Sequence, residues 1–398
     1  MITRRTVLQG SAAALAALGP LKAFADETAT LPFENGTRPI VKYPQKRPML
    51  RLTARPPQLE TPFSVYNEGV ITPNDAFFVR YHIADIPFDT LDIDTFTVEI
   101  KGKVNKPLKL KVADLKRMPS IEIVAVNQCS GNSRGFSEPR VPGGQSANGA
   151  MGNARWRGVA LKTVLDMAGV QAGAKQVTLN GLDSPVIEPT PDFIKALDID
   201  HARDGEVMLA YQMNGADLPI LNGFPVRLVV PGYYGTYWVK HLFELNVIDN
   251  VYDGFWMKTA YRIPDNECAC VEPGTAPKTT VPIGRFNVRS FITSVLDGAK
   301  VKAGQTTLKG IAFDGGTGIK EVAVSTDDGK SWAQAKLGND LGKYSFREWT
   351  LPVNLAAGAH VLKVRATSNG GKTQPEKATW NPAGYMRNVI ETTRVTAA

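Results

Sequence analysis

Residues 121–135 read IEIVAVNQCSGNSRG. The first six residues are mostly apolar and β-branched, a pattern that predicts a buried strand at 121–126. The polar loop that follows begins near Cys129, and its glycines allow the backbone to approach a bound group closely. A nearby Arg134 would stabilise a thiolate. We therefore expect the Cys129 sulfur to face a polar cavity; the alternative is a small, buried and inert cysteine.

The same loop contains a motif that resembles a nucleophile elbow. Gly131, Ser133 and Gly135 match the G-x-S-x-G pattern of serine hydrolases. That elbow requires a helix directly after the serine, and the nearby Pro139 and Pro142 exclude one. The sequence therefore argues against a hydrolase.

The N-terminus has the pattern of an export signal. Arg4 and Arg5 precede an apolar run at 7–18, and the small residues at 23–25 offer a cleavage site. We expect residues 1–25 to be a twin-arginine signal peptide, so that the protein is exported folded to the periplasm. No later segment has 18 uninterrupted apolar residues, so we expect no membrane span.

Changes in composition divide the rest of the chain. The expected parts are an extended N-terminal arm (26–60), a mixed α/β domain (61–270), a linker (271–282) and an all-β immunoglobulin-like sandwich (283–398). The last part consists of short alternating segments separated by Gly, Asp and Asn turns. The expected fold class is therefore α+β.

Local patterns place some elements within these domains. Alternation predicts a strand at 95–101, and short helices are expected at 161–168 and 191–197. Asn214 and Gly215 predict a hairpin turn. Residues 325–332 resemble an Asp-box, which as a single copy predicts a β-hairpin turn with a packed tryptophan.

Charge and cysteine content exclude several classes. The chain has 398 residues, 43% of them hydrophobic, and a formal net charge of +8 without basic runs, so we expect no nucleic-acid partner. Three cysteines cannot form a disulfide framework for a chain of this length. Cys268 and Cys270 could form a disulfide, a metal site or two free thiols, and we favour a structural role.

Two further clusters could bind an anion. Arg80 and His82 lie on one face if their segment is extended, and such a pair suits an oxyanion or a phosphate. The alternative is a surface arginine beside a satisfied histidine. Arg227 falls inside an apolar strand, so its charge should have an anionic partner.

Taken together, the motifs resemble the sulfite oxidase family of molybdenum enzymes. They are FVRYH (78–82), CSGNSR (129–134), GGQSANGAMGNARWRG (143–158), NGFPVR (222–227) and WVK (238–240). The resemblance covers nearly the whole chain after residue 25, and residues 283–398 are similar to the family's dimerisation domain. Residues 61–270 would then be the molybdopterin-binding catalytic domain.

The resemblance implies molybdenum and molybdopterin as cofactors. Cys129 would bind the metal, because a thiolate is a soft, electron-rich ligand. The residues that would hold the pterin and its phosphate are Phe78, Arg80, His82, Asp183, Asn222, Arg227, Trp238, Val239 and Lys240. Vertebrate-type members have a histidine where this chain has Asn222, so we expect an altered hydrogen bond to the cofactor.

The resemblance also implies a substrate pocket. Arg80, Arg134 and Tyr261 match its catalytic residues: two guanidinium groups can fork around a divalent oxyanion, and the phenol can hydrogen-bond to the reacting group. Sulfite would be oxidised to sulfate, and two electrons would leave one at a time. A basic residue of the second domain, Lys330 or Arg347, could join this pocket.

The expected function is a periplasmic sulfite dehydrogenase. The chain contains no C-x-x-C-H haem motif, so the electron acceptor would be a separate cytochrome c or a haem subunit. The enzyme would form a homodimer or a complex with that subunit. The alternatives are a sulfane dehydrogenase, a methionine-sulfoxide reductase (though these generally lack the C-terminal sandwich) and, from a different class, a cofactor-free periplasmic anion-binding protein.

Overall fold

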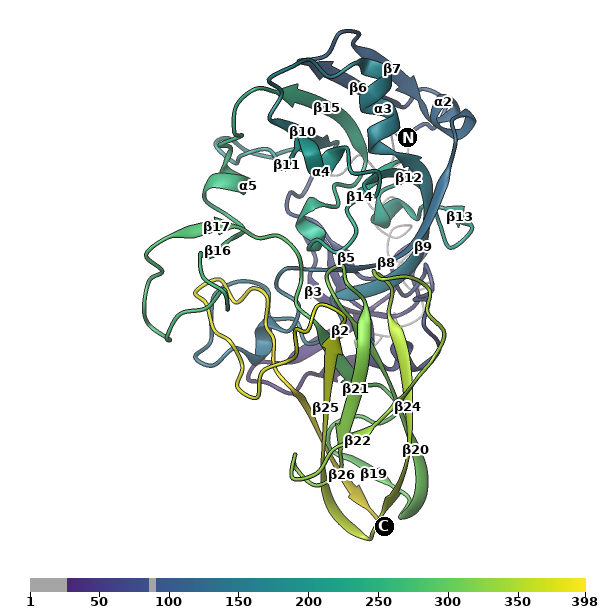
Figure 1. Ribbon diagram of the computed structural model, residues 1–398, viewed down its shortest axis with the longest axis vertical. Coiled ribbons are helices and arrows are strands. Elements are labelled where there is room, and N and C mark those ends of the chain that lie inside the picture. The colour runs from purple at the N-terminus through teal and green to yellow at the C-terminus, as the bar shows by residue number, and fades with distance from the viewer. Residues whose placement is uncertain (1–26, 86–90) are drawn as a thin grey trace, which may run out of the picture.

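The computed structural model describes residues 27–85 and 91–398, so the expected signal peptide at 1–25 lies outside the described residues. Sheets make up most of the regular structure in two lobes, one above the other in Figure 1. The longest helix among the described residues, α3 (Leu161–Ala168), has eight residues. The structure is therefore mostly β, with less helix than the α+β expectation implied.

Short strands form in the segment that was expected to be an extended arm. They are β1 (Thr28–Thr30), β2 (Thr37–Val41), β3 (Met49–Thr53) and β4 (Gln58–Glu60), which form one sheet with β5 (Val79–Arg80). Gln58 lies opposite Arg80 in this sheet. The N-terminal segment is therefore the strand partner that holds Arg80 in an extended conformation.

A second sheet carries the loop of Cys129. It contains β8 (Ile121–Gln128), β9 (Met151–Ala160), β12 (Met208–Met213) and β13 (Ala216–Asp217), with β14 (Arg227–Val229) paired to β12. β8 confirms the predicted strand and is buried from Val124 onward. Asn214 and Gly215 join β12 to β13 with positive φ angles of 54° and 80°, as the predicted turn requires.

A third sheet shows one wrong prediction. It contains β6 (Thr97–Gly102), β7 (Leu108–Lys111), β10 (Gln176–Gly181), β11 (Ile194–Asp198) and β15 (Leu242–Ile248). β6 matches the strand predicted at 95–101, but the helix predicted at 191–197 is instead the antiparallel strand β11 beside β10. Lys195, Ala196 and Leu197 are all buried, so a helix here would have no solvent face. Pairing with β10 overrides the local pattern.

The helices are short connectors. In the described part of the chain, the other α-helices are α2 (Val112–Arg117), α4 (Ile199–Ala202) and α5 (Phe255–Lys258), and the 3₁₀ turns are η1 (Phe63–Asn67), η2 (Arg134–Phe136), η3 (Ile220–Asn222) and η4 (Gly235–Tyr237). α3 confirms the helix predicted at 161–168, and it ends at Gly169 with a φ of 69°.

The C-terminal region consists of two further sheets after the hairpin of β16 (Arg262–Pro264) and β17 (Thr280–Pro282). The first contains β18 (Arg289–Ile292), β20 (Gly304–Phe313), β23 (Lys336–Leu337) and β24 (Arg347–Leu355); the second contains β19 (Ala299–Val301), β21 (Ile319–Ser325), β22 (Ala333–Gln334), β25 (Gly358–Ser368) and β26 (Glu391–Ala397). Leu308, Trp349 and Leu362 share a core of their own. Residues 325–332 form the predicted turn between β21 and β22, where the backbone N–H of Ser331 donates to Asp327 Oδ1 (2.9 Å).

A return segment, residues 369–390, connects the C-terminal strands to the larger lobe (Figure 1). Within it, the N–H of Met386 donates to the carbonyl of Ser130 (3.2 Å). Arg289 at the start of β18 donates to Ser133 Oγ (3.0 Å) and pairs with Glu391. The C-terminal region therefore contacts the loop of Cys129 directly.

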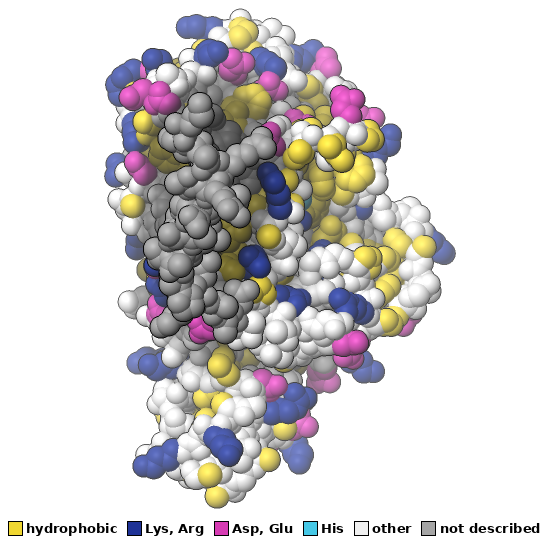
Figure 2. Space-filling model, turned by 180° about the vertical axis from the view of Figure 1, so that it is seen from behind, with side chains coloured by type: hydrophobic (Ala, Val, Ile, Leu, Met, Phe, Trp, Pro, Cys, Tyr) yellow, Lys and Arg dark blue, Asp and Glu magenta, His cyan; other side chains and the backbone are white. Residues whose placement is uncertain are grey.

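Charges are mixed on the face shown in Figure 2, where Lys and Arg side chains lie among acidic and apolar ones. Within residues 27–85 and 91–398, none of the helices combines the length and apolar character needed to cross a membrane.

Candidate active site

Backbone and side-chain hydrogen bonds hold the loop that starts at Cys129. The N–H of Cys129 donates to the carbonyl of Ala150 (2.9 Å). Ser133 is fully buried, has a φ of 71°, and its hydroxyl lies between Asn148 Oδ1 (2.6 Å) and Arg289 Nη1 (3.0 Å). The Ser133 hydroxyl therefore links the loop of Cys129 to Asn148 and to Arg289 of β18. It is not an exposed nucleophile, which agrees with the sequence argument against a hydrolase.

A cavity opens beside Cys129, the free cysteine of the described residues. Its volume is about 500 Å³, which includes space open to solvent. The predicted site residues that line it are Phe78, Arg80, His82, Cys129, Asn222, Arg227, Trp238, Lys240 and Tyr261. They come from β5, the loop after β8, η3, β14, the end of η4 and the approach to β16, so the fold gathers motifs that are far apart in the sequence.

Positive charge is concentrated in the wall of this cavity. Arg227 is 3% exposed, and its guanidinium donates to the carbonyls of Asn222 (2.9 Å) and Trp238 (3.1 Å). Lys240 Nζ donates to the carbonyl of Arg80 (2.8 Å). Burial lowers the pKa of Lys240 to about 7 and that of Arg227 to about 9. Because burial opposes both charges, an anion in the cavity would be strongly stabilised.

Two predicted residues, Asp183 and Val239, are not among the residues that line this cavity, and both lie next to Gly181. An added Cβ on Gly181 would lie 3.0 Å from Asp183 Oδ1 and 3.1 Å from Val239 Cγ1. Burial raises the pKa of Asp183, while the charge of Lys240 lowers it. Asp183 therefore acts on the cavity through the charge of Lys240, and Val239 accepts a backbone hydrogen bond from Leu228 (2.8 Å).

Several polar atoms around the cavity are ready to bind a large polar group. Among the described residues, the lining side chains with a buried polar atom that has no hydrogen-bond partner are His82 (Nδ1), Asn127 (Oδ1), Ser130 (Oγ), Arg227 (Nε) and Thr236 (Oγ1). Buried polar atoms are almost always hydrogen-bonded. Together with the cations and the soft sulfur of Cys129, these donors and acceptors fit the molybdenum and molybdopterin that the sequence resemblance implies.

Arg80 and Arg134 meet at a second cavity beside Cys129. This cavity encloses about 340 Å³ and is lined by all three residues. Arg134 Nε donates to the carbonyl of Ala383 (3.0 Å), and Arg80 donates to the carbonyl of Tyr81. Each guanidinium has five N–H donors, so both retain donors for an oxyanion.

Tyr261 is held by a neutral histidine. Burial, followed by the charge of Arg80, keeps the pKa of His82 well below its usual value, so the ring is uncharged. The neutral ring can then donate its Nε2 proton to the Tyr261 oxygen, which leaves the phenolic proton free, and the ring stacks on Phe193 with centroids 3.8 Å apart. Burial raises the pKa of Tyr261, so the phenol stays protonated.

The C-terminal region supplies a residue that the sequence analysis missed. Lys330 lies in the turn at 325–332, and Arg347 pairs with a carboxylate near its own strand. Instead, the ring of Tyr385 stacks on that of Tyr261, with centroids 5.2 Å apart and planes 8° apart, and the guanidinium of Arg134 lies 5.1 Å from its centroid. Neither Lys330 nor Arg347 is among the residues that line the two cavities, and charge alone does not indicate which segment folds back.

The structure resolves the three options for Cys268 and Cys270 in favour of a disulfide. The carbonyl of Ala269, between them, accepts a hydrogen bond from Asn381 Nδ2 (3.2 Å), and Asn381 Oδ1 accepts one from the N–H of Tyr385 (3.1 Å). The disulfide loop therefore braces the segment that carries Tyr385. The turn-forming run NPAG at 381–384 is the sequence signal that marks this segment.

Comparisons with known proteins give matches along most of the chain. Residues 84–256 match the oxidoreductase molybdopterin binding domain, and residues 280–397 match the Mo-co oxidoreductase dimerisation domain. Human mitochondrial sulfite oxidase is 34% identical over 382 residues, which cover 91% of this chain and 68% of that protein. Sulfite oxidase of Arabidopsis thaliana is 30% identical over 383 residues, which cover 89% of this chain and 96% of that protein.

A solved structure is similar along almost the whole chain. The sulfane dehydrogenase SoxCD from Paracoccus pantotrophus superposes with a TM-score of 0.73 at 25% sequence identity. The superposition covers 92% of this chain and 87% of that one. The likeness therefore extends over both lobes.

Proposed function

The chain belongs to the sulfite oxidase family of molybdopterin enzymes, and from that premise we propose that it is a periplasmic sulfite dehydrogenase. The family assignment makes it a molybdenum-dependent, sulfite-oxidising oxidoreductase. The proposal adds a location and an acceptor. Sulfite and water become sulfate, two protons and two electrons, and the electrons pass one at a time to a cytochrome c.

The observation that carries the proposal is the thiol of Cys129 in one cavity with Arg80, Arg227 and Lys240. We assign Cys129 as the metal ligand, since a thiolate is a soft donor. Molybdenum, when bound, supplies the two-electron redox chemistry that side chains cannot provide. The three cations would pair with the phosphate of the pterin, and the other residues that would hold the cofactor are Phe78, His82, Asp183, Asn222, Trp238 and Val239.

Arg80 and Arg134 are assigned to sulfite. They approach the space beside Cys129 from different elements, β5 and η2, so a divalent oxyanion between them accepts hydrogen bonds from both. Tyr261 holds its proton on the phenolic oxygen, and neutral His82 fixes that oxygen in place. The phenol can therefore donate to an oxygen on which negative charge develops.

Sequence features support the location and the acceptor. The paired arginines ahead of an apolar run support export by the twin-arginine route. These 398 residues contain no C-x-x-C-H motif, which supports a separate cytochrome c or haem subunit. The match of residues 280–397 to a dimerisation domain supports a dimer.

A sulfane dehydrogenase is the second candidate. The observation that favours it is the similarity to the solved sulfane dehydrogenase over both lobes. The two candidates differ in substrate: one oxidises sulfite, and the other oxidises sulfane sulfur.

The test uses purified protein of known molybdenum content. Sulfite and a persulfide are supplied separately, with ferricyanide, cytochrome c or oxygen as acceptor. We expect turnover with sulfite and cytochrome c; turnover with the persulfide alone establishes the second candidate, and turnover sustained by oxygen alone contradicts the cytochrome assignment. Cell fractionation tests the location: replacing both Arg4 and Arg5 with Lys should leave the protein in the cytoplasm, and unchanged export would contradict the twin-arginine route.

A further inference from the structure

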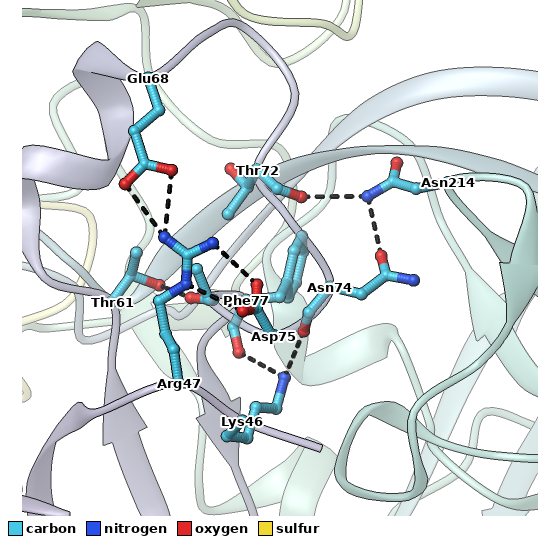
Figure 3. Close-up of polar contacts among 10 residues, drawn as sticks. Lys46, Arg47, Thr61, Glu68, Thr72, Asn74, Asp75, Phe77 and Asn214 are labelled. Atoms are coloured by element: carbon cyan, nitrogen blue, oxygen red, sulfur yellow. Dashed lines mark hydrogen bonds and ion pairs between the residues drawn. The ribbon is translucent and has the colours of Figure 1, made fainter. Parts of the chain in front are cut away.

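Lys46 is a buried lysine in the segment between β2 and β3. It is 3% exposed, and its ammonium has three acceptors: the carbonyls of Asn74 (2.7 Å) and Phe77 (2.9 Å) and the side-chain Oδ1 of Asn222 (2.5 Å). Figure 3 shows Lys46 pointing toward Asn74 and Phe77, while the adjacent Arg47 turns to Glu68 and Asp75. An ammonium has three protons, so these acceptors use all of them.

The contact with Asn222 determines how that side chain lies in the cavity wall. An ammonium only donates, so Oδ1 must face Lys46, and Nδ2 donates instead to the carbonyl of Phe78 (3.0 Å). The backbone carbonyl of Asn222 accepts from Arg227 (2.9 Å). Three hydrogen bonds therefore hold Asn222, and the one from Lys46 sets the orientation of its amide.

Lys46 also organises the approach to β5. Its acceptors on Asn74 and Phe77 lie in the segment that leads to Val79–Arg80, and Asn74 is held in turn by Asn214 Nδ2 (2.8 Å; Figure 3). One ammonium therefore joins the N-terminal segment, the strand that carries Arg80 and the wall residue Asn222.

The charge of Lys46 lies behind the cationic wall. Burial lowers its pKa to about 7, Asp75 raises it and Arg227 lowers it further. Asp75 is itself engaged by Arg47 (2.9 Å), which also pairs with Glu68 (3.0 Å). An anionic group bound in the cavity would therefore be stabilised by Lys46 as well as by the residues that line the cavity.

We propose that Lys46 is a positioning residue for the molybdopterin site: it locks the amide of Asn222 and adds a positive charge behind the phosphate-binding wall. Lys46 acts through Asn222, which lines the cavity, and not by touching the cofactor. The inference rests on the proposed cofactor site but not on sulfite as the substrate.

The first test measures cofactor retention. Holoenzyme is prepared with Lys46→Met, which keeps the length of the side chain without donors or charge, and with Lys42→Met, an exposed control in the same segment. Cofactor release is followed by pterin fluorescence and by molybdenum content after gel filtration. Loss of a residue that orients a ligand typically weakens metal binding by about ten- to a hundredfold. We expect release about tenfold faster or more in Lys46→Met and unchanged in Lys42→Met.

The second test separates positioning from general stability. In an Asn222→Ala background, Lys46→Met should accelerate cofactor release less than it does alone, because the side chain that Lys46 positions is gone and only its charge remains to be lost. If Lys46→Met does not fold, Lys46→Gln replaces it in the same comparison with Asn222→Ala, because glutamine keeps N–H donors without the charge.

Additive effects of the two substitutions would overturn the proposal, as would equal cofactor release from Lys46→Met and the unsubstituted protein. Sulfite turnover by the unsubstituted holoenzyme is measured separately, so failure of the proposed substrate remains distinguishable from failure of this inference.

Discussion

Removing the ring of Tyr385 tests whether the return segment shapes the substrate pocket. In Tyr385→Leu, the stack on Tyr261 and the contact with Arg134 are both lost. An aromatic pair contributes about 0.5–1.5 kcal/mol and a cation–π contact about 0.5–2 kcal/mol, so the combined loss is about 1–3.5 kcal/mol. Because Arg134 keeps its hydrogen bond to Ala383, only part of this loss reaches the substrate. We expect the KM for sulfite to rise about tenfold, the change that ~1.4 kcal/mol produces.

The assay is steady-state sulfite oxidation with ferricyanide, normalised to molybdenum content. Tyr385→Phe is the matched control because it keeps the ring, and its KM should stay within about threefold of the unsubstituted value, since the aromatic contacts remain. A KM in Tyr385→Leu equal to that of the unsubstituted protein would refute the reasoning. An equally large effect of Tyr385→Phe would show that the hydroxyl, and not the ring, matters.

The other predictions address the metal ligand, the oxyanion clamp and the buried lysines. Cys129→Ser should lose molybdenum and activity while keeping its fold by circular dichroism; retained turnover would remove Cys129 as ligand. Arg134→Gln should raise the KM for sulfite by about ten- to a hundredfold, as expected for charge-assisted hydrogen bonds of about 1.5–3 kcal/mol, whereas Arg140→Gln, an exposed control in the same loop, should not. The pKa of Lys240 is about 7 in the folded protein, compared with an ordinary value of 10.5. Between these two pH values the unfolded chain therefore binds more protons than the folded one. The free energy of unfolding of the cofactor-free protein should then increase as pH rises from 7 toward 9. Lys240→Met should flatten that rise in a denaturant titration at several pH values, and an unchanged slope would contradict the pKa shift.

Much of the site is predictable because its motifs are local. The apolar run before Cys129 predicted β8, and the loop composition predicted a polar cavity beside the thiol. Arg80 and His82, two residues apart, both line that cavity. In each case, neighbouring residues carry the information that determines their own conformation.

The residues that sequence analysis missed depend on distant contacts. Tyr385 reaches Tyr261 only because the chain returns from β25 to the larger lobe, and Lys46 meets Asn222 across a gap of 176 residues. The strand at Ile194–Asp198 was mistaken for a helix for the same reason, since its pairing with β10 decides its conformation. A local pattern does not contain such information.

The central claim is that this chain oxidises sulfite at a molybdenum centre held by Cys129. The most direct measurement is an anaerobic reaction of limiting sulfite with excess ferricyanide, catalysed by protein of known molybdenum content, with Cys129→Ser run in parallel. We expect two ferricyanide ions to be reduced for each sulfate formed, at a rate proportional to molybdenum content, and no reaction in Cys129→Ser. Absence of sulfate formation by fully loaded protein, or a rate independent of molybdenum, would contradict it.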